Sequence, residues 1–129
     1  MRRRRAIAVA LAALVVAVDL VHEALTPTPF HHVRSPAVFV LAAAIAVALL
    51  VLAPRIPSLT VACGAGIASG GALGTFFSGF AWSGVPDPLV RGGIAFNVSD
   101  IAIAAGDALL VAAVLFHAWT HRHELSRPV

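Results

Sequence analysis

Of all the side chains in this sequence, those of Asp87 and Asp100 are best suited to act together in catalysis. They stand at either end of a short segment of Gly, Pro and aromatic residues, with long apolar runs before and after it. Two carboxyl groups that approach closely do not both ionise readily, so one keeps its proton while the other remains a base. Such a pair can activate a water molecule and protonate a leaving amine without forming a covalent intermediate. The pair therefore predicts a hydrolytic site.

The residues around each aspartate predict how it is held. Asp87 lies between two prolines, and we expect it in an extended loop because a residue before proline avoids the helical conformation. Asp100 falls on the first turn of a predicted helix, where Asn97 is the expected N-cap and accepts from the N–H of Ser99 or Asp100. The alternative is structural, with Asp87 as a turn residue and Asp100 as a capping residue near the positive helix end.

The composition indicates a membrane protein. Of the 129 residues, 60% are hydrophobic and only 12% are charged, with a mean hydropathy of +0.93, and a soluble domain of this size cannot bury so much apolar surface. No interior segment is polar and long enough for a second domain, so residues 1–129 are interpreted as a single integral membrane domain. A helix needs about 20 residues to cross the hydrocarbon. Four apolar segments predict an all-α, four-helix transmembrane bundle, at about 6–25, 37–53, 59–80 and 98–119.

All nine basic residues are arginines, and their distribution predicts the topology. Seven flank one end of the predicted spans, at Arg2 to Arg5, Arg55, Arg122 and Arg127; the other two are Arg34 and Arg91. By the positive-inside rule both termini and the short central loop face the cytoplasm, and loops 26–36 and 81–97 face outward with the aspartates. The pI of about 11.1 then reflects topology and anionic lipid headgroups, and no nucleic acid is expected as a partner.

The N-terminal arginines followed by an apolar run also resemble a cleavable signal peptide. The apolar run of about 20 residues is long for the hydrophobic region of a signal peptide, about 7 to 15 residues, and no Ala-x-Ala cleavage site follows it. A retained first helix is therefore favoured.

The third and fourth predicted spans resemble signal peptidase II, the prolipoprotein signal peptidase, a four-helix membrane aspartyl protease. Members carry GGAxGNxxDR near the outer end of the third helix, then V-V-D-F, and F-N-x-A-D where the fourth helix opens. This chain has GGALG at 70–74, VPDP at 85–88 and FNVSD at 96–100. The resemblance implies that Asp87 and Asp100 are the catalytic pair. It further implies a bacterial cytoplasmic membrane protein that cleaves lipid-modified prolipoproteins before the lipidated cysteine at the outer boundary.

The chain departs from the family pattern in several places, and the loop between the two aspartates is also shortened. The first helix of the family ends in D-Q-x-[ST]-K, of which Asp19 alone is kept in the segment 19–23. In the third helix, Thr75, Ser78 and Gly79 replace the Asn, Asp and Arg of the pattern. The stretch 26–36, about eleven residues, is too short for the small β cradle that members form there.

Several further residues are assigned to substrate binding or support of the site. An acid within a span costs about 2.5 to 3.5 kcal/mol, so Asp19 is expected to face the bundle interior, either tuning the site or pairing with Arg34 or His22. Arg34 also begins the segment that corresponds to the family's N-x-G-A-A-F. Asn97 is included as the cap. Gly66, Gly70 and Gly74 recur every four residues, which predicts close helix packing.

For Gly71 and Gly74 the resemblance adds a second role, the close approach of a lipid-modified substrate. Asp107 follows Asp100 by two helical turns, roughly 10 Å deeper, and is expected to stay protonated and hydrogen-bond a small polar residue of the third span such as Ser69. The histidines near Glu23, at 22, 31 and 32, fit no firm zinc pattern, so no metal or other cofactor is expected.

Two competing functions remain open. The first is a non-catalytic relative that keeps the fold and binds a lipoprotein or a partner helix, favoured by the replacements at Thr75, Ser78 and Gly79. The second is a small proton- or ion-handling protein that uses Asp19, Asp100 and Asp107, although no polar file continues to the cytoplasmic face. The expected partners under the protease interpretation are membrane lipids and a lipidated prolipoprotein.

Overall fold

The computed structural model describes residues 1–125, and most of them are helical. Four long helices are each long and apolar enough to cross a membrane, which confirms the predicted fold class. They are α1 (Arg2–Leu25), α2 (Pro36–Leu52), α3 (Leu59–Ala81) and α4 (Val98–Thr120), with the short helices η1 (Ala53–Arg55) and α5 (Arg122–Leu125) after α2 and α4. The largest difference from the predicted bounds is at α1, which begins at Arg2 because arginine is a good helix former.

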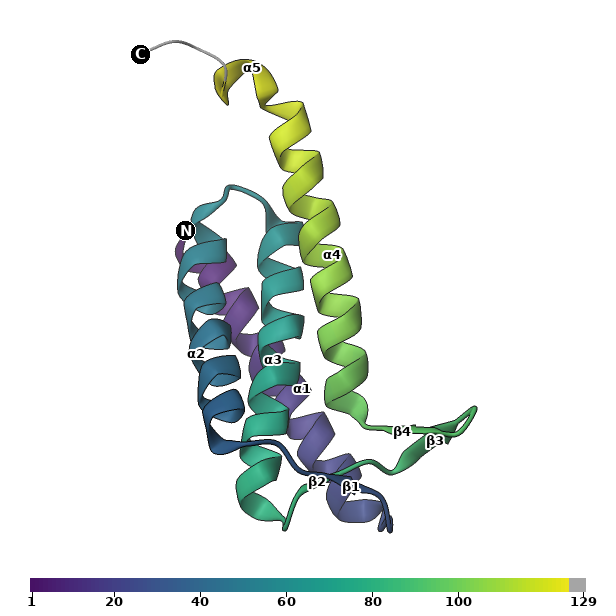
Figure 1. The fold of residues 1–129 in the computed structure, drawn as a ribbon. Helices are drawn as coiled ribbons and strands as arrows, with labels where there is room; N and C mark the ends of the chain where they lie inside the picture. Colours follow the sequence, from purple (N-terminus) through teal and green to yellow (C-terminus); the bar gives the residue numbers. More distant parts are fainter. Residues whose placement is uncertain (126–129) are drawn as a thin grey trace.

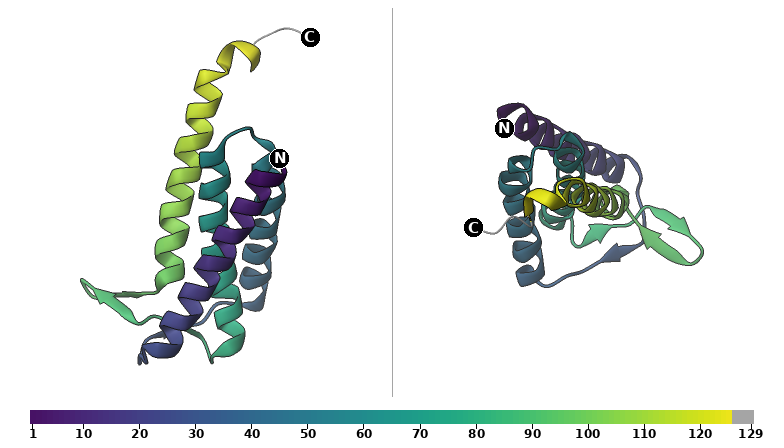
Figure 2. Two further views of the ribbon diagram at one scale, coloured as in Figure 1. Left: turned by 180° about the vertical axis from the view of Figure 1, so that it is seen from behind. Right: turned by 90° about the horizontal axis from the view of Figure 1, so that it is seen from above.

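Three of the four long helices surround the fourth, α3. In Figure 1, α3 lies between α2 and α4, and the view from behind in Figure 2 shows α1 crossing the opposite side of α3. The N-terminus, η1 and α5 lie at one end of the bundle, which we call the terminal end. Residues 26–35 and 82–97 form the other end, called the loop end. The predicted alternation of loops is therefore present, and Arg127, used in the topology prediction, lies outside the described residues.

Helix α3 accepts its neighbours closely because its contact faces carry glycine. A Cβ atom added at Gly66 would lie 2.5 Å from the carbonyl oxygen of Ala8, and one added at Gly70 would lie 2.7 Å from Cβ of Val15. On the other side, a Cβ at Gly64 would lie 2.7 Å from the backbone nitrogen of Leu110 in α4. Small residues at these positions let helix backbones approach in a membrane, so the predicted packing role of the glycine repeat is confirmed.

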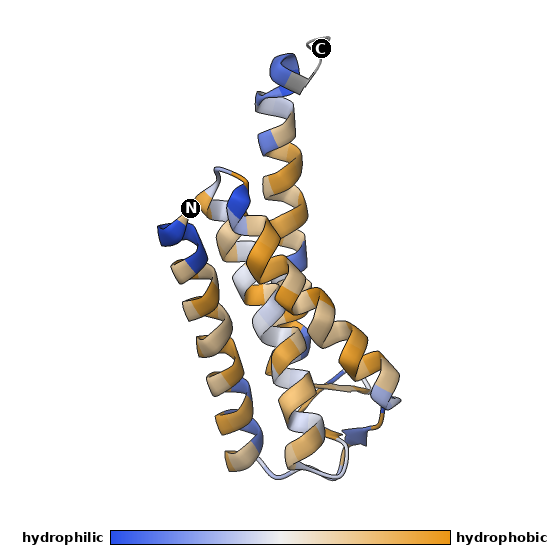
Figure 3. Cartoon of the chain, turned by 90° about the vertical axis from the view of Figure 1, so that its left-hand side faces the viewer, coloured by the Kyte–Doolittle hydropathy of each residue, from blue (hydrophilic) through white to orange (hydrophobic). Residues whose placement is uncertain are grey.

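The other three helices direct many apolar side chains outward. Large exposed hydrophobic residues occur along α1, α2 and α4. Figure 3 shows hydrophobic colouring along much of the long helices, with hydrophilic residues at the N-terminus and near the C-terminal end. Such a surface suits hydrocarbon rather than water.

Local signals start the helices after each break. The side chain of Ser35 accepts from the N–H of Val38 at 3.4 Å, and Pro36 occupies the first turn of α2. Ser58 likewise accepts from Val61 at 3.3 Å at the start of α3. A serine N-cap and an early proline both favour helix initiation.

Two pairs of short strands at the loop end were not predicted. Strand β1 (His31–His32) pairs antiparallel with β2 (Val85–Pro86), and β3 (Leu89–Arg91) pairs with β4 (Ile94–Phe96). The β3–β4 turn uses glycines at 92 and 93, with φ of +59° and +78°, as a tight hairpin requires. This hairpin projects sideways from the bundle (Figure 2). The short stretch 26–36 thus supplies one two-residue strand, and the hairpin comes from the loop between the two aspartates.

Candidate active site

Four carboxyl side chains gather at the loop end, where α1 and α4 meet α3. Asp19 and Glu23 come from the last turns of α1, Asp87 follows β2, and Asp100 lies in the first turn of α4. Asn97 contacts three of them, Asp87, Asp100 and Glu23, and Asp19 contacts Ser99, two residues further along the chain. We call these four residues the acid cluster.

Asp87 is held mainly by the loop that precedes α2. Its backbone N–H donates to the carbonyl of Phe30 at 2.9 Å, and its carbonyl accepts from the hydroxyl of Thr28 at 3.3 Å. Nδ1 of His32 lies 2.7 Å from its Oδ2, an ion pair when the imidazole is protonated. Asp87 is 5% exposed. The expected extended conformation is therefore fixed by the pairing of β1 with β2, and His32 is a partner that the sequence did not predict.

Asp100 forms a reciprocal cap with Asn97. The N–H of Asp100 donates to Oδ1 of Asn97 at 2.9 Å, and the N–H of Asn97 donates to Oδ2 of Asp100 at 3.1 Å. This capping box satisfies two backbone donors that the first turn leaves open. The predicted cap is confirmed, and it fixes the direction of the Asp100 carboxyl group.

Asn97 also joins the two aspartates. It is fully buried, and its Nδ2 lies 3.2 Å from the carbonyl of Pro86, 3.4 Å from Oδ1 of Asp87 and 3.4 Å from Oε1 of Glu23. An amide nitrogen has two protons, so these three acceptors share two donors. Asp87 and Asp100 therefore both contact Asn97 at the loop end, and their role as a catalytic pair stays a prediction.

Asp19 binds the start of α4. Its Oδ1 accepts from the backbone N–H of Ser99 at 2.8 Å, and its Oδ2 accepts from the Ser99 hydroxyl at 2.5 Å. Asp19 is fully buried and faces the bundle interior as predicted. Its hydrogen-bond partner is Ser99 instead of Arg34 or His22, because the first-turn N–H groups of a helix need acceptors. Ser99 stands where the family segment F-N-x-A-D has alanine, and that difference is the signal by which it could have been found.

Glu23 and Ser78 form a second buried contact that the sequence did not predict. The Ser78 hydroxyl donates to Oε2 of Glu23 at 2.5 Å, and both residues are buried. Counting from Asp19, the family pattern has lysine at position 23; counting from Gly70, it has aspartate at position 78. An acid and a hydroxyl thus meet where the pattern has a base and an acid. The motifs give the residue types at positions 23 and 78 but do not relate the two positions in space. Beside them, the hydroxyl of Thr75 is buried and has no hydrogen-bond partner in residues 1–125.

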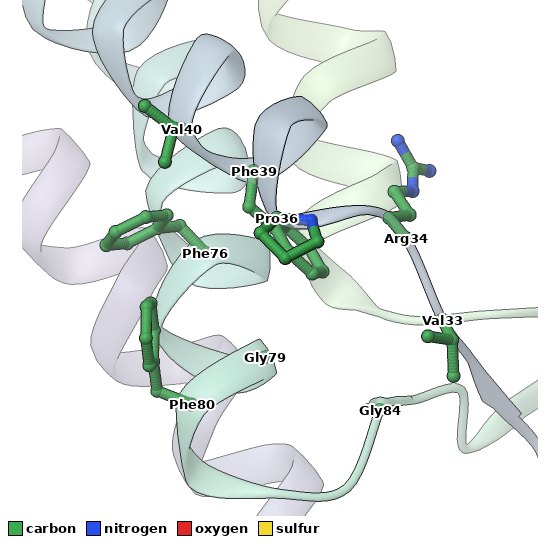
Figure 4. A pocket seen from close by; sticks show the side chains of 9 residues that line it. All are labelled: Val33, Arg34, Pro36, Phe39, Val40, Phe76, Gly79, Phe80 and Gly84. Atoms are coloured by element: carbon green, nitrogen blue, oxygen red, sulfur yellow. The ribbon is translucent and has the colours of Figure 1, made fainter.

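Arg34 lies at a different place, on the rim of a pocket of about 260 Å³ between α2 and α3. Figure 4 shows the aromatic rings of Phe39, Phe76 and Phe80 around this α2–α3 pocket. Gly79 forms part of its wall, and a Cβ there would lie 3.1 Å from the Phe39 ring. The pocket shares no lining residue with the acid cluster, so the structure separates Arg34 from Asp19, Asn97 and the two aspartates.

Gly71 and Gly74 are closed off by neighbouring helices. A Cβ at Gly71 would lie 2.6 Å from the carbonyl oxygen of Ser99, and one at Gly74 would lie 2.8 Å from Oδ2 of Asp19. Both glycines are buried. These contacts favour the packing interpretation over close approach by a substrate.

The predicted hydrogen bond between Asp107 and Ser69 is wrong. The Ser69 hydroxyl donates to the carbonyl of Ala46 in α2 at 3.0 Å, and Asp107 is exposed. The residue of α4 that touches α3 at this level is Gly106, where a Cβ would lie 2.7 Å from Cα of Ala68. Asp107 is one residue further on and therefore points about 100° away from that contact.

Comparison with known proteins assigns the family. The family model described as signal peptidase (SPase) II matches residues 28–116, which is more than half of the chain and includes Asp87, Asn97 and Asp100. A search of curated proteins gives no significant match. The match agrees with four helices able to cross a membrane and with the motifs at the loop end. This chain belongs to the signal peptidase II family, a family of aspartic peptidases.

Proposed function

We propose that this protein is an aspartic endopeptidase that cleaves lipid-modified prolipoproteins at the outer boundary of the bacterial cytoplasmic membrane, with Asp87 and Asp100 as its catalytic pair. Family membership supports a lipoprotein signal peptidase function in general and a multi-pass membrane location. The observation that carries the assignment of the pair is the contact of Asn97 with both aspartates.

The pair would hydrolyse the peptide bond with one shared proton. The ionised carboxylate removes a proton from water as the oxygen attacks the scissile carbonyl, and the protonated partner supplies the proton that leaves with the amine. Titration then belongs to the pair rather than to either residue. Asp100 has one oxygen engaged in the helix cap, which leaves the other available to a water molecule.

The surrounding residues would position this pair. Asp19 holds the first turn of α4 through Ser99 and thereby supports Asp100, while His32 and Asn97 fix the Asp87 carboxyl group. Arg34 and the apolar α2–α3 pocket, at the same end of the bundle, suit a substrate with an acyl chain and a polar group beside it. Gly71 and Gly74 would act by letting α1 and α4 approach rather than by contacting substrate.

The arginine distribution supports an outward-facing site. Of the described arginines, those at positions 2 to 5, 55 and 122 lie at the terminal end, and Arg34 and Arg91 lie at the loop end. By the positive-inside rule the terminal end, with both termini, faces the cytoplasm.

A non-catalytic relative is the second candidate, and the Glu23–Ser78 contact favours it. This contact replaces two charged positions of the family pattern with an acid and a hydroxyl, so the site lacks the pattern's lysine. A relative of this kind would keep the fold and bind a lipoprotein without cleaving it.

Cleavage of a lipidated prolipoprotein peptide in detergent separates the two candidates. We expect turnover by the unmodified protein and a loss of about 10² to 10⁴ in rate for Asp87→Asn and for Asp100→Asn. Asp107→Asn is the matched control, because it makes the same change in the same helix as Asp100 but outside the acid cluster, and its rate should be unchanged. Binding of the peptide without turnover by the unmodified protein would support the non-catalytic candidate.

A further inference from the structure

Asp107 is an acidic residue in the middle of a membrane-spanning helix, facing outward. It lies nine residues after Val98, the first residue of the 23-residue helix α4, which places it about 14 Å along the helix axis. That is close to the centre of a hydrocarbon layer about 30 Å thick. Asp107 is exposed and makes no hydrogen bond or ion pair within residues 1–125.

The carboxyl group lies beside a groove of about 200 Å³ that is lined by residues of α2, α3 and α4. Helices α2 and α4 form its two sides, as their positions in Figure 1 indicate. Four of its lining residues are alanines, two from α2 and two from α3: Ala42, Ala46, Ala68 and Ala72. We call this the mid-span groove. Its one hydroxyl, on Ser69, is already bonded to Ala46, so Asp107 is the polar group left open.

An open acid at this depth requires a polar partner. A charged side chain near the bilayer centre costs about 2.5 to 3.5 kcal/mol on insertion scales, and such residues normally pair with one another. An acyl chain in the groove would leave the carboxyl group unsatisfied. The alanines let another helix backbone approach closely, and the acid calls for a cation on that helix.

We propose that the mid-span groove binds one transmembrane helix of another membrane protein, which carries a lysine or arginine near the bilayer centre on a face of small residues, and that Asp107 pairs with that base. This proposal is independent of the peptidase reaction. The apolar region of a signal peptide has no base of its own, so the substrate's leader is not the occupant.

The described part of a second copy, residues 1–125, does not offer the required cation. Its described arginines lie at helix ends or in loops, at 2 to 5, 34, 55, 91 and 122. The histidines within the long helices, His22 and His117, also lie near helix ends. None of these side chains reaches the middle of a neighbouring span, so the base must come from a different protein.

The test uses a synthetic transmembrane peptide of alanine and leucine with one central lysine, and a second peptide with leucine in place of that lysine. Binding to the full-length protein in phosphatidylcholine vesicles is followed by energy transfer between dyes. We expect the lysine peptide to bind about tenfold more weakly to Asp107→Asn than to the unmodified protein. The leucine peptide should bind both proteins equally.

Groove shape is tested with a matched pair on α2. Ala42→Leu fills the groove and should weaken binding of the lysine peptide, whereas Ala44→Leu adds the same atoms to an exposed position outside the groove and should not. An unchanged melting temperature in detergent shows that each variant is folded, whether or not the protein cleaves a substrate. The proposal is overturned if the lysine peptide binds Asp107→Asn as tightly as the unmodified protein. It is equally overturned if the protein self-associates without peptide and Asp107→Asn abolishes that association.

Discussion

The acid cluster and Asp107 place the same chemical group in two opposite situations. At the loop end, all four carboxyl groups are bound by residues of this chain: Asp19 by Ser99, Glu23 by Ser78, and the two aspartates by Asn97. On the far side of α3, Asp107 has no partner in the described part of the chain. The acid cluster is thus organised by this protein alone, whereas Asp107 is suited to a second protein.

The two situations also differ in what surrounds the acid. The cluster lies where chain ends, strands and helix starts offer many N–H and hydroxyl donors, and every acid there contacts a donor from another segment or from its own helix cap. Around Asp107 the regular helices have already used their backbone donors internally, as a membrane requires. A side chain of another molecule is then the available source of a hydrogen bond or a positive charge.

Removing the Asn97 amide should have the largest effect. Asn97→Ser keeps a side chain able to cap α4 but loses the amide that contacts Asp87 and Glu23. We expect the cleavage rate to fall by about 10³, measured on the lipidated peptide, with little loss of thermal stability.

Asn97→Ala is the companion variant for that measurement. It loses the cap as well, so we expect the same fall in rate together with a loss of about 1 kcal/mol in the free energy of unfolding. If Asn97→Ser cleaves at the normal rate, the amide does not organise the two aspartates. The acid cluster would then not depend on Asn97.

Exchanging the Glu23–Ser78 contact for the family's charges should give the next largest effect. Ser78→Asp alone places a second carboxyl group against Glu23 in a buried site, and we expect a loss of about 3 kcal/mol in the free energy of unfolding. Glu23→Lys with Ser78→Asp restores a pair of opposite charges, so the double variant should recover most of that stability.

A double-mutant cycle on thermal melting in detergent measures this coupling. Ser78→Asn is the neutral control of similar size and should cost less than Ser78→Asp. Additive effects of Glu23→Lys and Ser78→Asp would contradict the direct contact between the two positions.

The helices were predictable from sequence, and so was part of the site. Hydropathy and the prolines between spans fix where a helix can cross, and the spacing of Asn97 and Asp100 identifies a cap because capping is local. The strands at 31–32 and 85–86 were not predictable, since two residues carry no alternation. The Glu23–Ser78 contact joins residues 55 positions apart, which local patterns do not relate.

For Asp107, the depth along the span was predictable from sequence but the direction of the side chain was not. Its spacing from Asp100 gave its depth, but the direction of its side chain depends on how α4 is rotated against α3. That rotation is fixed by the contact of Gly106 with Ala68, a packing detail between helices. The sequence therefore placed Asp107 correctly along the span and assigned it the wrong neighbour.

Alanine substitutions of two serines, one in each region, should change stability and activity the least. Ser99→Ala removes the hydroxyl that donates to the Asp19 carboxylate and keeps the backbone N–H bond to the same group. A hydrogen bond to a charged group contributes about 1.5 to 3 kcal/mol, and one between neutral groups contributes about 0.5 to 1.5 kcal/mol. Ser69→Ala removes a hydrogen bond between neutral groups, to the carbonyl of Ala46. Thermal melting should therefore show the greater loss of stability for Ser99→Ala.

Cleavage should also slow severalfold in Ser99→Ala, because Asp19 then holds the first turn of α4 by one hydrogen bond. The cleavage rate of Ser69→Ala should stay normal. Equal losses of stability in the two variants would mean that Asp19 is bound no more strongly than a backbone carbonyl, and the acid cluster would then be less organised than its short contacts imply.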